Sequence, residues 1–188
     1  MLENFLAAQR VNAANALIPQ QHRKGKILDV GCGTHPFFLL NTEFREKYGL
    51  DKVSRGKEPH HEIEIKGFDI ERGAGIPFPD AFFDVVTMLA VIEHVEPEKC
   101  VDILKGIRRV LKPGGCCIIT TPAFWTDGLL WFLSRIRLLS AEEIDEHKGS
   151  FSRQKLHALL QEAGYMAGDI SSGYFEAFMN IWVRAKKE

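Results

Sequence analysis

The chain has 188 residues, which suffices for one domain with a hydrophobic core but is short for two. Its formal net charge is −1, so no overall basic field exists to gather nucleic acid, and we expect no nucleic-acid partner. No stretch reaches the roughly 18 apolar residues of a membrane span, and the first residues lack the apolar core of a signal peptide, so we expect a cytoplasmic protein.

The predicted elements alternate between helices and strands. A helix is expected where apolar residues recur near every 3.6 positions, and a strand where a short apolar run lies between turn residues. These patterns predict helices over 2–18, 37–48, 97–115 and 152–164, and strands over 26–30, 48–51, 61–70, 83–91, 116–122 and 178–186. Pro36 is expected to begin the second helix and Ser152 to cap the last one.

This order of elements predicts an α/β fold with an open, mostly parallel sheet and helices on both faces. We interpret residues 1–188 as a single domain that begins with a helix inside 1–19. In such sheets, ligands bind at the carboxyl ends of the strands, so we expect a functional site there.

The four cysteines are Cys32, Cys100, Cys116 and Cys117. None form a CxxC pair, and Cys116 and Cys117 are adjacent in a predicted strand, so their side chains should point to opposite faces. A zinc site would need better ligand spacing, so we expect buried free thiols and no metal site.

Residues 27–36 read ILDVGCGTHP, and the glycines directly after a strand indicate a ligand close to the backbone. A dinucleotide fingerprint has a third glycine where Pro36 stands here, and Pro36 removes an N–H group that would hold phosphate. Asp29 adds negative charge to the same corner. The loop therefore favours a cationic or zwitterionic group over a pyrophosphate.

Two further acids end predicted strands. Asp51 ends the second strand, where a carboxylate can accept both hydroxyls of a ribose, and Asp69 ends the third. Together with the glycine loop they indicate an adenosine-bearing ligand without a diphosphate. The alternative is that the glycines only form turns and the acids only cap helices.

Four segments in this order carry a family resemblance: ILDVGCGT, GLD, FDIERGAGIPFPDAFFDVVTMLAVIEHV and RRVLKPGGCCIITTP. They resemble class I S-adenosylmethionine-dependent methyltransferases, most closely the small-molecule group that includes quinone-biosynthesis enzymes. The resemblance covers about residues 25–183. It implies a Rossmann-like, doubly wound sheet of seven strands, and S-adenosyl-L-methionine as the cofactor.

The resemblance also implies roles for single residues. Gly31, Cys32 and Gly33 form the loop against the methionine part of the cofactor, and Asp29 orients the loop and the amino group. The remaining assignments are Asp51 to the ribose hydroxyls, Asp69 and Ile70 to the adenine, Ala90 to the sulfur side, and His35 to the mouth of the site or the methionine carboxylate. Family members usually have glycine where His35 stands, and the segment 52–61 that follows Asp51 is polar and unusually charged for the family.

A catalytic base is needed only if the acceptor arrives protonated. His94 is the first candidate because histidine titrates near neutral pH, and His147 is the second. Each histidine has a structural alternative: His94 as a helix cap or packing group, His147 as a surface residue.

The segment 124–139 is strongly apolar and follows the fifth strand, where the family places elements that cover the acceptor. We interpret 122–150 as an acceptor-side insertion or lid; the alternatives are a peripheral membrane contact, a dimer contact and core packing.

The sequence thus predicts an S-adenosylmethionine-dependent methyltransferase acting on a small acceptor that is apolar or lipid-linked. The alternatives are a non-catalytic scaffold that binds the cofactor or a partner, and a nicotinamide-dependent oxidoreductase, which the missing third glycine disfavours.

Overall fold

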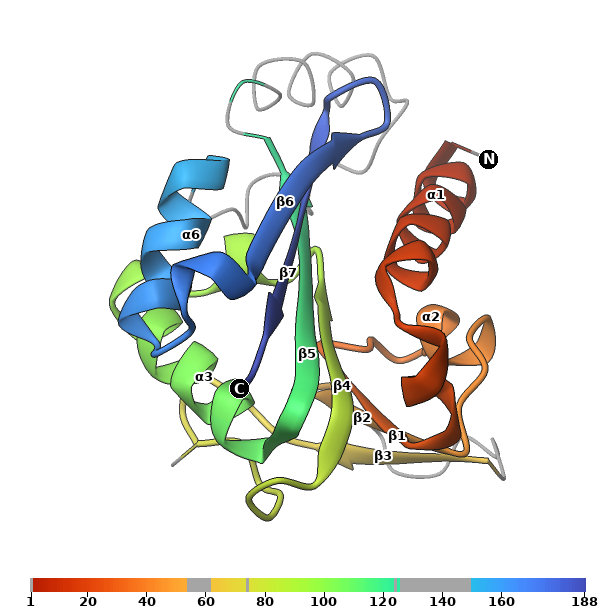
Figure 1. Ribbon diagram of the computed structural model, residues 1–188. Helices are drawn as coiled ribbons and strands as arrows, with labels where there is room; N and C mark the ends of the chain where they lie inside the picture. The colour runs from red at the N-terminus through yellow and green to blue at the C-terminus, as the bar shows by residue number, and fades with distance from the viewer. Residues whose placement is uncertain (1, 54–61, 74, 124, 126–149) are drawn as a thin grey trace.

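A seven-stranded sheet forms the centre of the computed structural model, which describes residues 2–53, 62–73, 75–123, 125 and 150–188 (Figure 1). Its strands are β1 (Lys26–Val30), β2 (Glu46–Asp51), β3 (Ile63–Gly67), β4 (Phe83–Leu89), β5 (Leu111–Pro122), β6 (Ile170–Phe175) and β7 (Asn180–Lys186). The strand order is β3-β2-β1-β4-β5-β7-β6. β1 to β5 pair in parallel, and β7 pairs antiparallel with β5 and β6.

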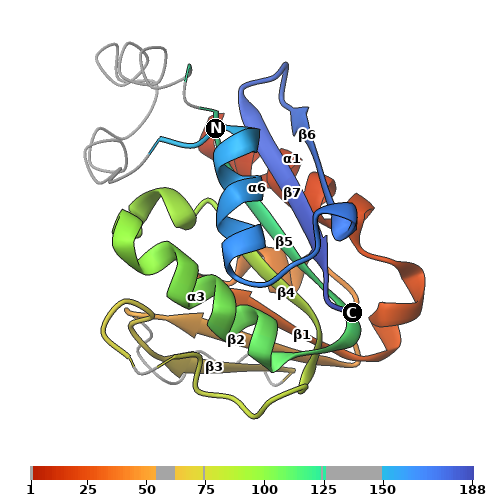
Figure 2. The same cartoon turned by 60° about the vertical axis from the view of Figure 1, so that its left-hand side comes forward.

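Helices cover both faces of this sheet. The helical elements are α1 (Leu2–Leu17), α2 (Phe37–Leu40), α3 (Pro97–Val110), α6 (Arg153–Glu162) and the 3-10 turns η1 (Gln20–Lys24), η2 (Ile92–His94) and η4 (Ala167–Asp169). In Figure 1, α1 and α2 lie on one side of the sheet and α3 and α6 on the other; Figure 2 shows α3 and α6 from nearer their own side. The predicted mostly parallel α/β sheet with helices on both faces is confirmed.

Two apolar clusters fill the spaces between the sheet and the helices on its two faces. Leu104 of α3 and Leu160 of α6 belong to the larger cluster, and Ala14 of α1 belongs to the smaller one. Cys116 lies in the smaller cluster and Cys117 in the larger, which confirms that these neighbours point to opposite faces. All four cysteines are buried and free.

The predicted ends of the last helix are also confirmed. The hydroxyl oxygen of Ser152 accepts a hydrogen bond from the backbone N–H of Lys155 at 3.2 Å. Gly164 follows α6 with φ of 97°, a left-handed conformation that glycine adopts without steric cost.

The predicted helix over 37–48 is wrong beyond Leu40. α2 ends at Leu40, and the Asn41 side chain donates to the carbonyl oxygen of Phe37 at 2.7 Å. Asparagine and threonine at 41 and 42 compete with the helix through their own side-chain hydrogen bonds, and the chain from Glu46 onward pairs with β1 instead.

The predicted helix over 97–115 is too long. α3 ends at Val110, and Leu111 already lies in β5, paired with Phe83 of β4. Pro113 disfavours helical geometry at the residue before it, so the helix pattern cannot continue into this segment. β6 was not predicted at all, because its residues ISSGYF have no clear apolar alternation.

Several predictions fall outside the described residues: His147, most of the charged segment 52–61, and the apolar segment 124–139 apart from Trp125, with most of the proposed lid over 122–150. Within the described chain, no helix combines the length and apolar character needed to cross a membrane. The cytoplasmic location stays a prediction.

Candidate active site

The glycine loop leaves β1 at the carboxyl end of the sheet. Gly31 and Gly33 have φ of 77° and 71°, a region that side chains other than glycine rarely adopt. A Cβ atom on Gly31 would lie 2.4 Å from Cγ2 of Val91, so no larger residue fits there without movement. The loop can therefore lie close to the end of β4 only because position 31 is a glycine.

Asp51 closes the loop from the neighbouring strand. Its Oδ2 accepts a hydrogen bond from the backbone N–H of Gly33 at 2.8 Å, and its Oδ1 accepts one from Val53 N–H at 2.8 Å. Asp51 thus joins the end of β2 to the glycine loop, with both carboxylate oxygens still able to accept a second donor.

Asp29 lies beneath the loop, within β1. Its side chain accepts a hydrogen bond from the Thr87 hydroxyl at 2.7 Å, and the residue is only 4% exposed. Burial raises the pKa of Asp29 to about 7, the nearby charge of Asp51 raises it further, and the bond from Thr87 opposes the rise.

Asp69 lies two residues beyond β3, so the prediction that it ends this strand is slightly wrong. Its carboxylate accepts from the backbone N–H of Glu71 at 2.9 Å and lies 3.5 Å from the guanidinium of Arg72. Asp69 and Ile70 share a cleft of about 90 Å³ with Gly31 and Asp51. The structure therefore brings the glycine loop and the residues predicted for ribose and adenine to one cleft.

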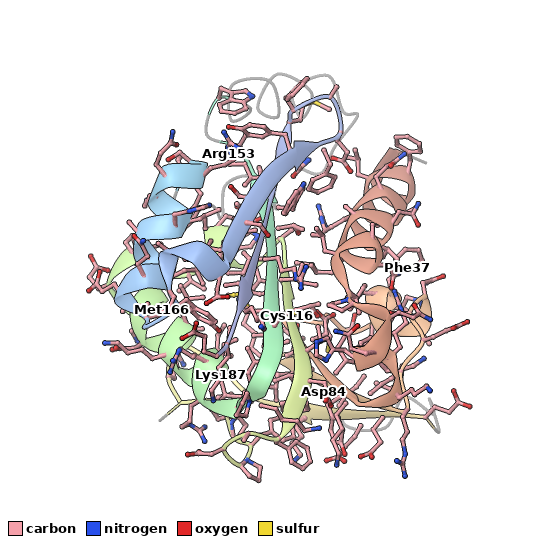
Figure 3. All side chains as sticks on the ribbon, viewed as in Figure 1. Phe37, Asp84, Cys116, Arg153, Met166 and Lys187 are labelled. Carbon is pink, nitrogen blue, oxygen red and sulfur yellow. The ribbon has the colours of Figure 1, made fainter. Side chains whose placement is uncertain are left out.

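A second and larger hollow, of about 570 Å³, lies at the opposite ends of the strands. It is lined by Phe44, Arg45, Glu46, Lys47, Tyr48, Glu62, Ile63 and Glu64. None of the predicted site residues line it. In Figure 3, Asp84 near the start of β4 marks this distal end of the sheet.

Neither Cys32 nor His35, both predicted as cofactor-binding residues, lines the cleft of about 90 Å³. The Cys32 side chain is 7% exposed and packs in the smaller apolar cluster under Gly49, so only its backbone belongs to the loop. Burial raises the pKa of this thiol to about 12. His35 is exposed at the loop surface.

Ala90 directly follows β4 in a strained conformation, with φ of 54°. Its backbone N–H donates to the carbonyl oxygen of Thr120 in β5 at 2.9 Å, which fixes the strand end. Left-handed backbone at alanine costs about 1–2 kcal/mol, and such residues cluster at functional sites.

His94 closes η2, half-buried, with its backbone N–H bonded to the carbonyl oxygen of Val91. The residue before it, Glu93, is 2% exposed and was not predicted as a site residue. The only available signal was the adjacency of an acid and a histidine after the fourth strand.

The cleft suits S-adenosylmethionine better than a dinucleotide. Asp51 and Asp69 supply carboxylates for ribose hydroxyls and an adenine amino group, and Gly31, which also lines the cleft, lets the backbone turn tightly against Val91. The helix after the loop, α2, has four residues, so its dipole offers little to a pyrophosphate. Within the described ranges, no group of three His, Cys, Asp or Glu residues could hold a metal ion.

Comparison with known proteins agrees with this geometry. The model of a family described as "Methyltransferase domain" matches residues 4–167. The chain belongs to this family. The ubiquinone biosynthesis O-methyltransferase of Idiomarina loihiensis is 32% identical to this methyltransferase domain over 133 residues, covering 62% of this chain and 52% of that protein.

Solved methyltransferases share the fold. An S-adenosylmethionine-dependent methyltransferase from Thermotoga maritima superposes with a TM-score of 0.73 at 20% identity, covering 98% of this chain and 90% of that chain. One from Archaeoglobus fulgidus gives 0.69 at 17% identity, covering 94% and 92%.

Together these matches confirm the predicted family, an enzyme family that uses S-adenosylmethionine, and its Rossmann-like fold. The matches to curated relatives span 37 to 52% of those proteins' own lengths. The roles predicted for individual residues stay predictions.

Proposed function

We propose that the protein transfers a methyl group from S-adenosylmethionine to an oxygen, or alternatively a carbon or nitrogen, of a small apolar acceptor. The observation that carries this proposal is the cleft shared by Gly31, Asp51, Asp69 and Ile70 at the carboxyl ends of the strands. The likeness to a ubiquinone biosynthesis O-methyltransferase supports an acceptor of quinone type.

The described residues bind and orient rather than react. When bound, S-adenosylmethionine supplies a methyl group on a positively charged sulfur, which an acceptor atom displaces in line. Gly31 and Gly33 let the backbone approach the methionine part, and Asp51 holds the ribose. Asp69 and Ile70 hold the adenine. Positioning of this kind accounts for much of the rate that a transfer reaction needs.

An apolar acceptor is proposed from the segment 124–139, of which the structure describes Trp125. The Trp125 ring is 46% exposed and its centroid lies 5.3 Å from that of Tyr174. The Arg153 guanidinium also contacts Tyr174, at 4.8 Å from the ring centroid. An exposed tryptophan in contact with Tyr174 supports the proposal of a lid over the acceptor, and a membrane or dimer contact is the alternative.

The test is methyl transfer from labelled S-adenosylmethionine to a panel of quinols, phenols, amines and lipids. Asp51→Asn should weaken S-adenosylhomocysteine binding by about 10- to 100-fold, because it removes a charged hydrogen-bond acceptor. Asp102→Asn, which changes an exposed carboxylate on α3, serves as the matched control and should bind normally.

Transfer to any member of the panel supports the proposal. Tight binding of S-adenosylhomocysteine without transfer to any acceptor would support the scaffold alternative instead. Failure to bind it at all would refute the proposal.

A further inference from the structure

Glu93 is a buried acid, and the described residues provide no hydrogen-bond partner for one of its carboxylate oxygens. It lies in η2, shortly after β4, with 2% of its surface exposed, and its Oε2 has no hydrogen-bond partner among the residues that the structure describes. The hydroxyl of Thr121 in β5 is buried beside it, close enough to oppose the rise in the pKa of Glu93 as a hydrogen-bond donor, but in the described part of the chain it forms no well-aligned hydrogen bond. Buried polar atoms are rarely left without good hydrogen bonds, so these two neighbours call for a ligand that pairs with both.

The charges around Glu93 come from three elements. Burial raises the pKa of Glu93, while the neighbouring His94 of η2, Arg10 of α1 and the hydroxyl of Thr121 oppose the rise. Glu176, after β6, also faces Arg10, but its carboxylate accepts a hydrogen bond from Asn180 and so has a partner. A carboxylate with a raised pKa is a stronger base than an ordinary glutamate.

The pair lies beside the point of methyl transfer. Ala90, which the family resemblance places on the sulfur side of the cofactor, precedes Glu93 by one short turn and bonds to the carbonyl oxygen of Thr120. Thr120 is the chain neighbour of Thr121. Glu93 and Thr121 therefore stand at the adjacent ends of β4 and β5, next to the strained residue.

We propose that Glu93 and Thr121 bind the reacting hydroxyl group of the acceptor, and that Glu93, rather than His94, is the catalytic base. A hydroxyl donates one hydrogen bond and accepts others, so it can donate to Glu93 Oε2 and accept from Thr121 Oγ1. An ammonium group cannot accept, and the charge of Arg10 disfavours a cation. The inference rests on the proposed function and narrows its acceptor to an alcohol or phenol.

The step balances without a further reactant. The acceptor's O–H proton moves to Glu93 Oε2 as the new O–CH₃ bond forms. The S–CH₃ bond breaks at the same time, and its electron pair stays on sulfur, which leaves as a neutral thioether. Glu93 then releases the proton to solvent.

The experiment compares phenol, which is neutral near neutral pH, with pentafluorophenol, which is already ionised there. Single-turnover transfer is measured for wild-type protein, Glu93→Gln, Thr121→Val and Glu176→Gln. Calorimetry measures binding of S-adenosylhomocysteine and then of phenol to each loaded protein. Glu176→Gln is the matched control, because it removes another carboxylate that faces Arg10.

Glu93→Gln should slow transfer to phenol about 100-fold or more, and transfer to pentafluorophenol less than about threefold, because an ionised acceptor needs no base. Thr121→Val should weaken phenol binding about fivefold with unchanged S-adenosylhomocysteine affinity. Glu176→Gln should change neither the rate of methyl transfer nor the affinity for phenol by more than about twofold.

Three results would overturn the inference. In the first, Glu93→Gln slows transfer to phenol and to pentafluorophenol equally. In the second, Glu93→Gln and Thr121→Val both behave as wild type, because a structural water pairs with the two side chains. In the third, the wild-type protein loaded with S-adenosylhomocysteine binds no phenol. Each leaves the proposed function standing as long as S-adenosylhomocysteine binds; loss of that binding in wild type would refute the proposed function itself.

Discussion

Replacing Asp29 with asparagine should change how stability depends on pH. Asp29 is 4% exposed, and burial raises its pKa from 3.8 to about 7. A carboxyl with a raised folded-state pKa binds its proton more tightly when folded. Its stabilising effect is full below the unfolded-state pKa and is lost as the pH rises through the folded-state value.

The size of the effect follows from the two pKa values. A rise from 3.8 to about 7, at about 1.36 kcal/mol for each pH unit, amounts to about 4 kcal/mol. Roughly 2.5 kcal/mol of this is lost between about pH 5 and pH 8, where the protein can be handled. Asparagine keeps the shape but cannot ionise, so the variant should escape this loss.

Thermal unfolding at about pH 5 and pH 8 measures the difference. For a domain of this size, 1 kcal/mol corresponds to about 2–4 °C, so the midpoint of Asp29→Asn relative to wild type should rise by about 5–10 °C between the two pH values. Asp102→Asn on the exposed face of α3 is the control and should follow wild type. An equal pH dependence of Asp29→Asn and wild type would refute the reasoning.

Two further substitutions test the loop and a helix end. Gly31→Ala should lower stability by at least about 1–2 kcal/mol in denaturant titrations, because alanine at φ of 77° is strained and its Cβ meets Val91; unchanged stability would contradict the close approach. Ser152→Ala should cost about 1 kcal/mol, or about 2–4 °C in midpoint, by removing the hydrogen bond to Lys155, whereas Ser171→Ala should cost less. Equal losses for the two serine variants would argue against the cap.

The sequence predicted the parts of the fold that local chemistry determines. The glycine loop, Asp51 at the end of β2 and the cap at Ser152 depend on a few adjacent residues, and each lies where it was expected, whereas Asp69 lies two residues beyond its strand. The convergence of the loop, Asp51 and Asp69 on one cleft also follows from the parallel order of β1, β2 and β3, which brings their carboxyl ends together.

Elements that depend on distant partners were harder to predict. Residues from Glu46 are a strand because they pair with β1, and Leu111 leaves the helix because it pairs with Phe83. Neither pairing is visible in local periodicity. β6 is likewise held by β7, since its own residues show no strand alternation.

The proposed base, Glu93, could not have been predicted from the sequence. Histidine is favoured because its intrinsic pKa lies near neutral, whereas Glu93 becomes a candidate only through burial and an unpaired oxygen. Both properties belong to the folded chain.

The central claim is that the cleft at Gly31, Asp51 and Asp69 binds S-adenosylmethionine. Thermal unfolding with S-adenosylhomocysteine, and separately with NAD, tests it most directly. A ligand at about a hundred times its dissociation constant adds about 2.7 kcal/mol, which should raise the midpoint by about 5–10 °C. The account predicts this rise with S-adenosylhomocysteine alone, and a rise with NAD alone, or with neither ligand, would contradict it.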